Sequence, residues 1–200
     1  MKRNISVLFF TVFLFTSAQI VHAGTIQGKI SVKGIRSPEN TVVYIDKMAG
    51  TFPPPKEHAI VDQRNMSFIP HVLPIVAGTT VDFKNNDDVL HNVFTPDECA
   101  EKFNLGTWAK GGTRSFIYKN AGCRGVLLCN VHPEMEGWVV VLQNPHFCKT
   151  GKDGLYTIKN VPAGTYTLKA WLPKATGPDS KVTVPQNGSV TVDISMTRKR

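Results

Sequence analysis

Residues 129–135 read Cys-Asn-Val-His-Pro-Glu-Met, and they directly follow the apolar run 126–128. This stretch places a thiol at Cys129, an imidazole at His132 and a thioether at Met135. A short apolar run bounded by turn signals predicts a buried β-strand. We therefore expect a strand whose end leads into a loop carrying three groups that can bind a soft metal ion.

A second imidazole, His91, stands upstream in the segment Leu-His-Asn-Val. Two histidines, one cysteine and one methionine form the ligand set of blue-copper electron-transfer sites, in which the methionine is a long, weak axial ligand. Thiolate and thioether favour Cu(I), whereas imidazole binds either oxidation state. The pattern predicts one mononuclear type 1 copper ion held by His91, Cys129, His132 and Met135.

The other histidines argue against a second copper centre. Multicopper enzymes need further histidines, commonly as His-x-His pairs, and the chain contains no such pair. We expect His58, His71 and His146 to face solvent. This favours an electron carrier over an enzyme, so no catalytic residue is predicted.

The N-terminus has the pattern of a secretory signal. Residues 1–4 are Met-Lys-Arg-Asn, residues 5–15 are mostly apolar, and residues 21–23 are Val-His-Ala. A basic start, a short apolar core and small residues at the exit are typical of a signal peptide, so we expect cleavage after Ala23 and a periplasmic protein. The alternative is an uncleaved anchor, but the apolar stretch is shorter than the roughly 20 residues of a membrane span.

The charge of the chain points away from nucleic acid. The formal net charge is +8, which becomes +6 when Lys2 and Arg3 leave with the signal. The only concentrated basic run is the tail 198–200. A mild, dispersed positive charge either steers an acidic protein partner or only keeps the protein in solution.

Short strands with frequent turn signals run through the whole chain, and no amphipathic helix is evident. The fold class is therefore all-β, with sandwiches as the expected architecture. We expect residues 97–113 to form a loop with one helical turn near 98–103, and Asp153-Gly154 to form a hairpin turn. The predicted strands are 24–32, 41–45, 81–84, 115–118, 125–128, 138–142, 155–159, 165–172, 181–184 and 189–195.

Residues 58–144 resemble a cupredoxin, a plastocyanin-like Greek-key sandwich. The resemblance is carried by Phe68-x-Pro70, Val76-Ala77-Gly78, Val81-x-Phe83-x-Asn85, Asp88-x-x-His91-Asn92-Val93 and Cys129-x-x-His132-x-x-Met135. The ligand spacing is similar to that of short-loop members such as amicyanin, and the segment is also similar to the methylamine-utilisation-type plastocyanin-like proteins of bacteria. The resemblance implies the copper site proposed above. It also implies that Asn92 ties the two ligand loops together.

Four cysteines allow two arrangements. In an exported protein, two disulfides are the default, and these would leave no thiolate for copper. The spacing of His132 and Met135 after Cys129 favours the copper arrangement. Cys99 and Cys123 both fall in the cupredoxin-like segment, so we predict a disulfide between them. Cys148 is then free or paired with another molecule.

The chain ends resemble a second family. The run Asp153-Gly154-x-Tyr156-x-Ile158 with Val161-Pro162-Ala163-Gly164-x-Tyr166-x-Leu168 is similar to transthyretin-like or carboxypeptidase-regulatory-like sandwiches, as is the strand 24–32. We therefore expect a signal peptide at 1–23 and one sandwich made of 24–52 with 145–200. The cupredoxin-like domain, 53–144, would be inserted between its two parts. The alternative is a cupredoxin with an extended N-terminus and a separate tail domain.

Three functions are compatible with these patterns. The leading hypothesis is one-electron transfer with a redox protein, such as a c-type cytochrome or a dehydrogenase, docking near His132. The second is a copper-binding protein for storage or delivery. The third is a structural or adhesive role with a degenerate loop, which the complete ligand set disfavours. We expect a monomer without a membrane span after signal cleavage.

Overall fold

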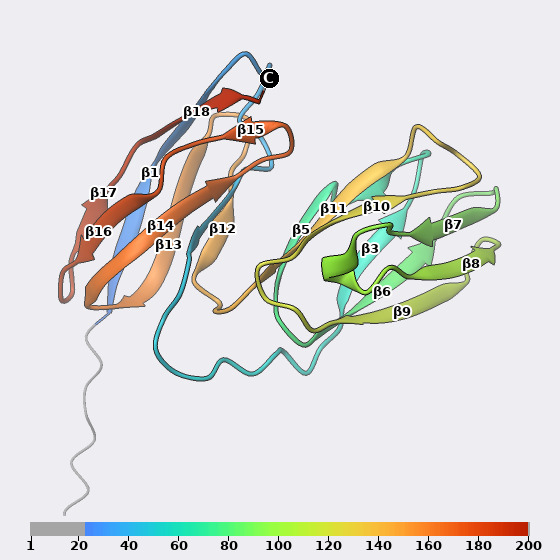
Figure 1. Cartoon of the computed structure of the whole chain (residues 1–200), viewed down its shortest axis with the longest axis horizontal. Helices are drawn as coiled ribbons and strands as arrows, with labels where there is room; N and C mark the ends of the chain where they lie inside the picture. Colours follow the sequence, from blue (N-terminus) through green and yellow to red (C-terminus); the bar gives the residue numbers. More distant parts are fainter. Residues whose placement is uncertain (1–22, 200) are drawn as a thin grey trace, which may run out of the picture.

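Alternation of apolar and polar residues decides which face of each strand points into a core. In β6 (Thr79–Asn85), buried and half-exposed residues alternate without exception, and Val81 and Phe83 point inward. The computed structural model describes residues 23–199 of the chain, and these residues form β-sheets and connecting loops. The predicted all-β class is thereby confirmed. Two β-sandwiches lie side by side (Figure 1).

The first sandwich, called here the central sandwich, spans residues 59–142. Its two sheets enclose a core that contains Phe68, Phe83, Trp108 and Tyr118. One sheet has the order β4-β3-β6-β9 and the other β5-β11-β10-β7-β8. Their strands are β3 (Ala59–Gln63), β4 (Phe68–Ile69), β5 (Val72–Val76), β7 (His91–Phe94), β8 (Asn104–Trp108), β9 (Thr113–Tyr118), β10 (Arg124–Leu128) and β11 (Glu136–Leu142).

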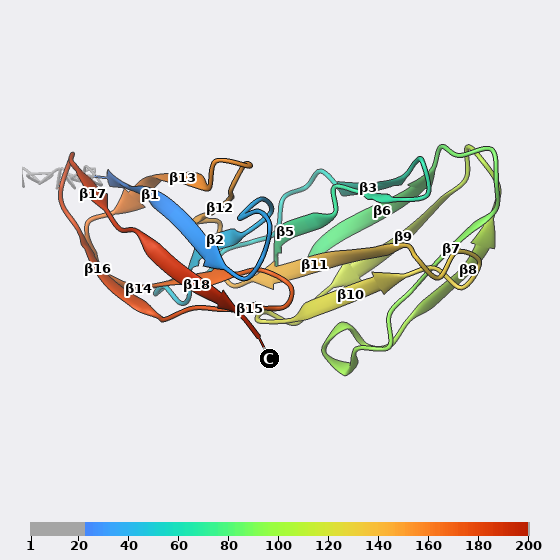
Figure 2. The same cartoon turned by 90° about the horizontal axis from the view of Figure 1, so that it is seen from above.

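The second sandwich, called the terminal sandwich, combines strands from both ends of the chain (Figure 2). One sheet has the order β13-β1-β18-β15, with β17 paired to β1, and the other has the order β12-β2-β14-β16. The strands are β1 (Ala23–Lys33), β2 (Val42–Ile45), β12 (Phe147–Lys149), β13 (Leu155–Pro162), β14 (Gly164–Trp171), β15 (Ala175–Thr176), β16 (Ser180–Val184), β17 (Ser189–Thr191) and β18 (Ile194–Arg198).

Strand pairing bears on how the domains are divided. β1 pairs antiparallel with β13 and parallel with β17 and β18, while β2 pairs antiparallel with β12 and β14. We therefore propose that 24–52 and 145–200 form one domain, with the domain 53–144 inserted between them. The two connections of the insert lie next to each other, because Met48 and Gln143 exchange two hydrogen bonds.

A third apolar cluster, the interface cluster, joins the two sandwiches. Its buried members are Val42 and Tyr44 of β2, Val72 of β5, and Val140 and Leu142 of β11. The neighbouring residues on β2 and β11 point the other way, into the core of their own sandwich. Both strands are thus buried on two faces, which explains why their sequences are continuously apolar instead of alternating.

Three sequence expectations need correction. Residues 97–113 are not a loop, because β8 lies within them after the 3₁₀ turn Glu98–Ala100. β8 is an edge strand with exposed residues, so its pattern is weak. The predicted strand 189–195 is two strands, β17 and β18, which keep one register on β1. The ladder is interrupted between them because the N–H of Lys29 donates to the side chain of Asp193, and the carbonyl of Val192 accepts from the hydroxyl of Tyr156.

The predicted hairpin at Asp153-Gly154 is also wrong. The turn exists: the N–H of Gly154 donates to the carbonyl of Gly151, and Gly154 has φ +76°. However, the strands on either side, β12 and β13, belong to different sheets. The turn therefore crosses from one sheet of the terminal sandwich to the other.

Of the predicted signal peptide, residues 1–23, all but Ala23 lie outside the described residues, and Ala23 is the first residue of β1. Within residues 23–199, no helix has the length and apolar character needed to cross a bilayer. Cleavage after Ala23 and export stay predictions.

Candidate metal centre

The turn that precedes β7 positions His91. The side chain of Asn85 is completely buried and donates to the carbonyls of Val89 and Trp108, at 2.9 and 3.0 Å. Its amide oxygen accepts the N–H of Asp87 at 2.9 Å. These bonds close the turn and place His91, itself 0% exposed, at the first position of β7.

The other expected ligands follow β10, the neighbour of β7 in the same sheet. β10 pairs with β7 through Leu128 and Phe94, so Cys129 leaves the sheet beside the strand that begins with His91. Cys129 is 3% exposed. The N–H of Met135 bonds to the carbonyl of His132 at 3.0 Å, which closes a turn just before β11 begins.

Three donor atoms converge at this end of the central sandwich. The Nδ1 atoms of His91 and His132 lie 3.0 Å apart, and Cys129 Sγ lies 4.0 Å from Nδ1 of His91. All three atoms lie within 4.8 Å of one another. In the part of the chain that the structure describes, this is the only group of three or more His, Cys, Asp or Glu side chains with such geometry.

Met135 is 1% exposed and belongs to the same apolar core cluster as Cys129. A buried methionine is more often a packing residue than a ligand. Its role as the axial ligand is therefore a proposal that rests on its position in the loop.

Asp87 is a site residue that the sequence reasoning missed. Its Oδ2 lies 2.8 Å from Nε2 of His91, and its carboxylate also accepts the N–H groups of Asn65 and Met66. Partial burial raises the pKa of Asp87, but these hydrogen bonds, with the nearby His91, outweigh burial and lower it. An acidic residue four positions before His91 was the available signal, yet only its neighbour Asp88 entered the motif.

This carboxylate determines the tautomer of His91. Because ionised Asp87 can only accept, Nε2 of His91 must carry the proton. The lone pair of His91 is then on Nδ1, the atom that faces His132 and Cys129. Carboxylate partners orient metal-binding imidazoles in this way.

Asn92 joins the two ligand-bearing segments, as the resemblance implied. Its Oδ1 accepts the N–H of Asn130 at 3.3 Å, and its Nδ2 donates to Asn104 Oδ1 and to the carbonyl of Gly106. The backbone N–H of Asn92 points at Cys129 Sγ, 3.4 Å away. Hydrogen bonds to the cysteine sulfur are one of the features that tune blue-copper sites.

The remaining histidines lie apart from this group. His58 is exposed and contacts Asp82 at 3.0 Å, and His71 is exposed as expected. His146 was expected to face solvent but is half-buried, with the ring of Phe52 edge-on to it. Partial burial lowers the pKa of His146, against an opposing hydrogen bond with the backbone of Lys159.

The cysteines follow the predicted arrangement in which Cys129 is a free thiol that could bind a metal. Cys99 and Cys123 form a disulfide, and Cys129 and Cys148 are free. Burial raises the pKa of Cys148 to about 11, so this thiol is protonated and unreactive at neutral pH.

The donor set fits a copper ion. Donors at about 2.0 Å for nitrogen and 2.3 Å for sulfur, the lengths known for zinc, are at most about 4 Å apart across one ion. The separations of 3.0 Å between the imidazole nitrogens and 4.0 Å between sulfur and His91 Nδ1 lie within that limit. The third, between Cys129 Sγ and His132 Nδ1, is within 4.8 Å, so the three atoms could share one ion after at most a small approach of these two groups. Two imidazoles with a thiolate are the ligands of trigonal His₂Cys copper sites.

Comparison with known proteins gives matches among solved structures only. No protein-family model and no curated protein matches the chain. The solved structures similar to it include a purple cupredoxin from Nitrosopumilus maritimus, with 26% identity and TM-score 0.38, covering 42% of this chain and 98% of that one. Amicyanin from Paracoccus versutus has 22% identity and TM-score 0.40, covering 50% and 96%. A Cu-containing nitrite reductase from Thermus scotoductus SA-01 has 26% identity and TM-score 0.40, covering 48% and 25%.

Proposed function

We propose that this protein binds one type 1 copper ion and carries single electrons between redox proteins of the periplasm, without being an enzyme. The ligands would be His91, Cys129 and His132, with Met135 in the axial position. The observation that carries the proposal is the convergence of two Nδ1 atoms and a buried sulfur at one end of a β-sandwich. Copper bound there would supply a one-electron Cu(I)/Cu(II) couple.

Hydrogen bonds from the surrounding residues restrain the proposed ligands. His91 is held by Asp87, the sulfur of Cys129 is approached by the N–H of Asn92, and Asn92 is itself bonded to Asn130. Fixed ligands leave little to rearrange when the metal changes charge. A site of this kind suits electron transfer better than rapid release of copper.

The surface near the ligands is suited to docking a protein partner. His132 is half-exposed, whereas His91 and Cys129 are buried, so electrons would pass through the edge of His132. Val89, Leu90 and Val131 adjoin the ligands in sequence and are 44%, 54% and 43% exposed. We propose that they form the contact face for a c-type cytochrome or a dehydrogenase.

Copper loading of the Cys129→Ser variant tests this proposal. The intact protein with Cu(II) is expected to show intense visible absorption from thiolate-to-copper charge transfer and a reversible one-electron potential. Cys129→Ser should lose both, because serine provides no soft sulfur donor. Cys148→Ser, which removes the other free thiol, should keep both.

The same samples distinguish an electron carrier from a copper storage or delivery protein. If copper passes to a chelator within seconds and shows no reversible potential, the protein is a storage or delivery protein. If intact protein loaded with Cu(II) stays colourless, the type 1 assignment is wrong.

A further inference from the structure

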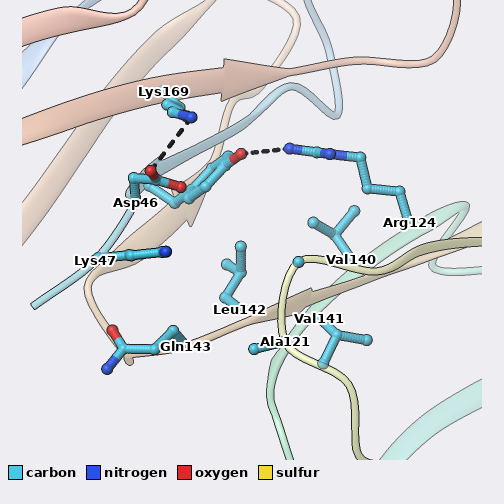
Figure 3. A pocket seen from close by; sticks show the side chains of 11 residues that line it. Asp46, Lys47, Ala121, Arg124, Val140, Val141, Leu142, Gln143 and Lys169 are labelled. Carbon is cyan, nitrogen blue, oxygen red and sulfur yellow. Dashed lines mark hydrogen bonds and ion pairs between the residues drawn. The ribbon is translucent and has the colours of Figure 1, made fainter. Parts of the chain in front are cut away.

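A cleft of about 410 Å³ lies where the two sandwiches meet (Figure 3). The terminal sandwich contributes Tyr44, Asp46, Lys47 and Lys169. The rest of the lining comes from the central sandwich and the residue that follows it: Ala121, Gly122, Arg124, Val140, Val141, Leu142 and Gln143. Its size is in the range of sites for small molecules. Apolar surface comes from Val140 and Leu142 of the interface cluster, together with Ala121 and Val141, and the other lining side chains are polar or charged.

The charges in the cleft are unbalanced. Lys169 is shared between Asp46 and Asp179, at 3.2 and 3.3 Å, so its charge is fully compensated and one negative charge of this group is left over. Arg124 and Lys47 form no ion pair with any acidic residue of the described chain 23–199. They approach the cleft from opposite sides in Figure 3.

Arg124 is an exposed residue that one hydrogen bond orients. Its Nη2 donates to the hydroxyl of the buried Tyr44 at 2.6 Å. A guanidinium has five N–H donors in a planar fork, so most of the donors of Arg124 stay available. A guanidinium held by a tyrosine, with a lysine ammonium on the other side of the cleft, favours carboxylate or phosphate, which both groups bind with charge-assisted hydrogen bonds.

We propose that this cleft binds a small organic anion whose carboxylate or phosphate group lies between Arg124 and Lys47, with its carbon skeleton against Val140 and Leu142. Lys47 follows β2 of the terminal sandwich and Arg124 begins β10 of the central sandwich. The bound anion therefore bridges the two sandwiches, and its binding raises the stability of the folded chain.

The cleft is independent of the metal centre. β10 has Arg124 at one end and leads into Cys129 at the other, and β11 likewise reaches the cleft at the end opposite the ligand loop. The anion is therefore expected to bind metal-free and copper-loaded protein alike. This inference neither needs the proposed function nor fails with it.

Calorimetric titration of the full mature chain at constant ionic strength tests the proposal. The probes are inorganic phosphate, glycerol phosphate and succinate, and comparing them distinguishes a phosphate from a carboxylate site. We expect saturable binding of at least one organic anion. Lys47→Gln and Arg124→Gln should each weaken it about tenfold, the loss expected for a hydrogen bond to a charged group. Lys152→Gln, at an exposed turn, is the matched control.

Two further measurements keep the result interpretable. Arg124→Lys keeps the charge but loses the fork, and should bind more tightly than Arg124→Gln. At the same concentration, the anion should raise the unfolding temperature of the intact chain more than that of the Lys47→Gln variant. The proposal is overturned if no organic anion binds more tightly than about 1 mM, or if Lys47→Gln binds like the intact chain.

Discussion

At the scale of single residues, the candidate metal centre depends on side chains that are not ligands. Asp87 accepts from His91 and so directs its Nδ1 toward Cys129 and His132. Without this acceptor, the His91 ring could carry its proton on either nitrogen. A carboxylate next to the site thus determines whether His91 offers a lone pair to a metal.

Asp87→Ala is therefore expected to weaken metal binding by about 10- to 100-fold, the range found when partners of metal-binding histidines are removed. Competitive titration with Cu(II) and a chelator measures the change. Asp88→Ala is the matched control, because Asp88 pairs only with Lys110 at the surface and should bind copper normally. Equal losses in the two variants would contradict the role given to Asp87.

His146 should make stability depend on pH. Burial, partly offset by a hydrogen bond with the backbone of Lys159, lowers the pKa of His146 in the folded chain. Its unfolded pKa is about 6.5. When the pH falls below that value, the unfolded chain binds more protons than the folded chain. The stability that the folded chain has at higher pH is therefore lost progressively as the pH approaches the lower pKa of the folded state.

Metal-free His146→Gln is expected to lose less stability than the intact chain between neutral and mildly acidic pH. Urea unfolding at the two pH values measures the difference. His71→Gln removes an exposed histidine and should leave the pH dependence unchanged. An identical acid loss in His146→Gln and the intact chain would show that other groups cause it.

At the scale of elements, the Cys99–Cys123 disulfide holds the edge of the central sandwich. It spans a sequence separation of 24 residues that contains the 3₁₀ turn, β8 and β9. β8 pairs only with β7, so it has few other constraints within the described chain. Closing the loop lowers the entropy of the unfolded chain, which stabilises the fold.

Replacing both cysteines by alanine should lower the free energy of unfolding by about 3 kcal/mol, as expected for a loop of this length. Urea denaturation measures this loss. Cys148→Ala removes a half-buried free thiol and should cost less. If the double variant is as stable as the intact chain, the unfolded state must already be restricted without the disulfide.

At the scale of the whole molecule, the interface cluster makes the two sandwiches one structure. β2 and β11 each present one face to their own core and the other face to this cluster. Trp138 and Trp171 also meet here, with ring centroids 5.5 Å apart. An apolar interface of this kind couples the stability of the two parts.

Leu142→Ala is expected to reduce stability by about 3 kcal/mol, as for other buried leucines, and to lower protection against hydrogen exchange in both sandwiches. Leu127→Ala is the matched control: Leu127 is equally buried but belongs only to the central core. Its effect should be concentrated in the central strands. If Leu142→Ala affects only those strands too, the interface does not couple the sandwiches.

The sequence by itself determined the all-β class, most strand positions and the residues of the ligand loop. The alternation of apolar and polar residues in strands is a local pattern, and so is the spacing of three residues between the candidate ligands of the loop. Both can be recognised in the sequence before the fold is known. The disulfide followed from resemblance to a family. β8 was not predicted, because an exposed edge strand lacks the apolar face that would identify it in the sequence.

Only the tertiary structure decided what covers each apolar face. A continuously apolar strand can be buried within one core, or it can have its second face covered by another domain. Periodicity does not distinguish these two cases, as β2 and β11 show. The contact of Asp87 with His91, and the cleft between Lys47 and Arg124, likewise depend on how packing brings side chains together. Such contacts depend on how close the groups lie in the folded chain, and neither their spacing along the sequence nor the composition shows this.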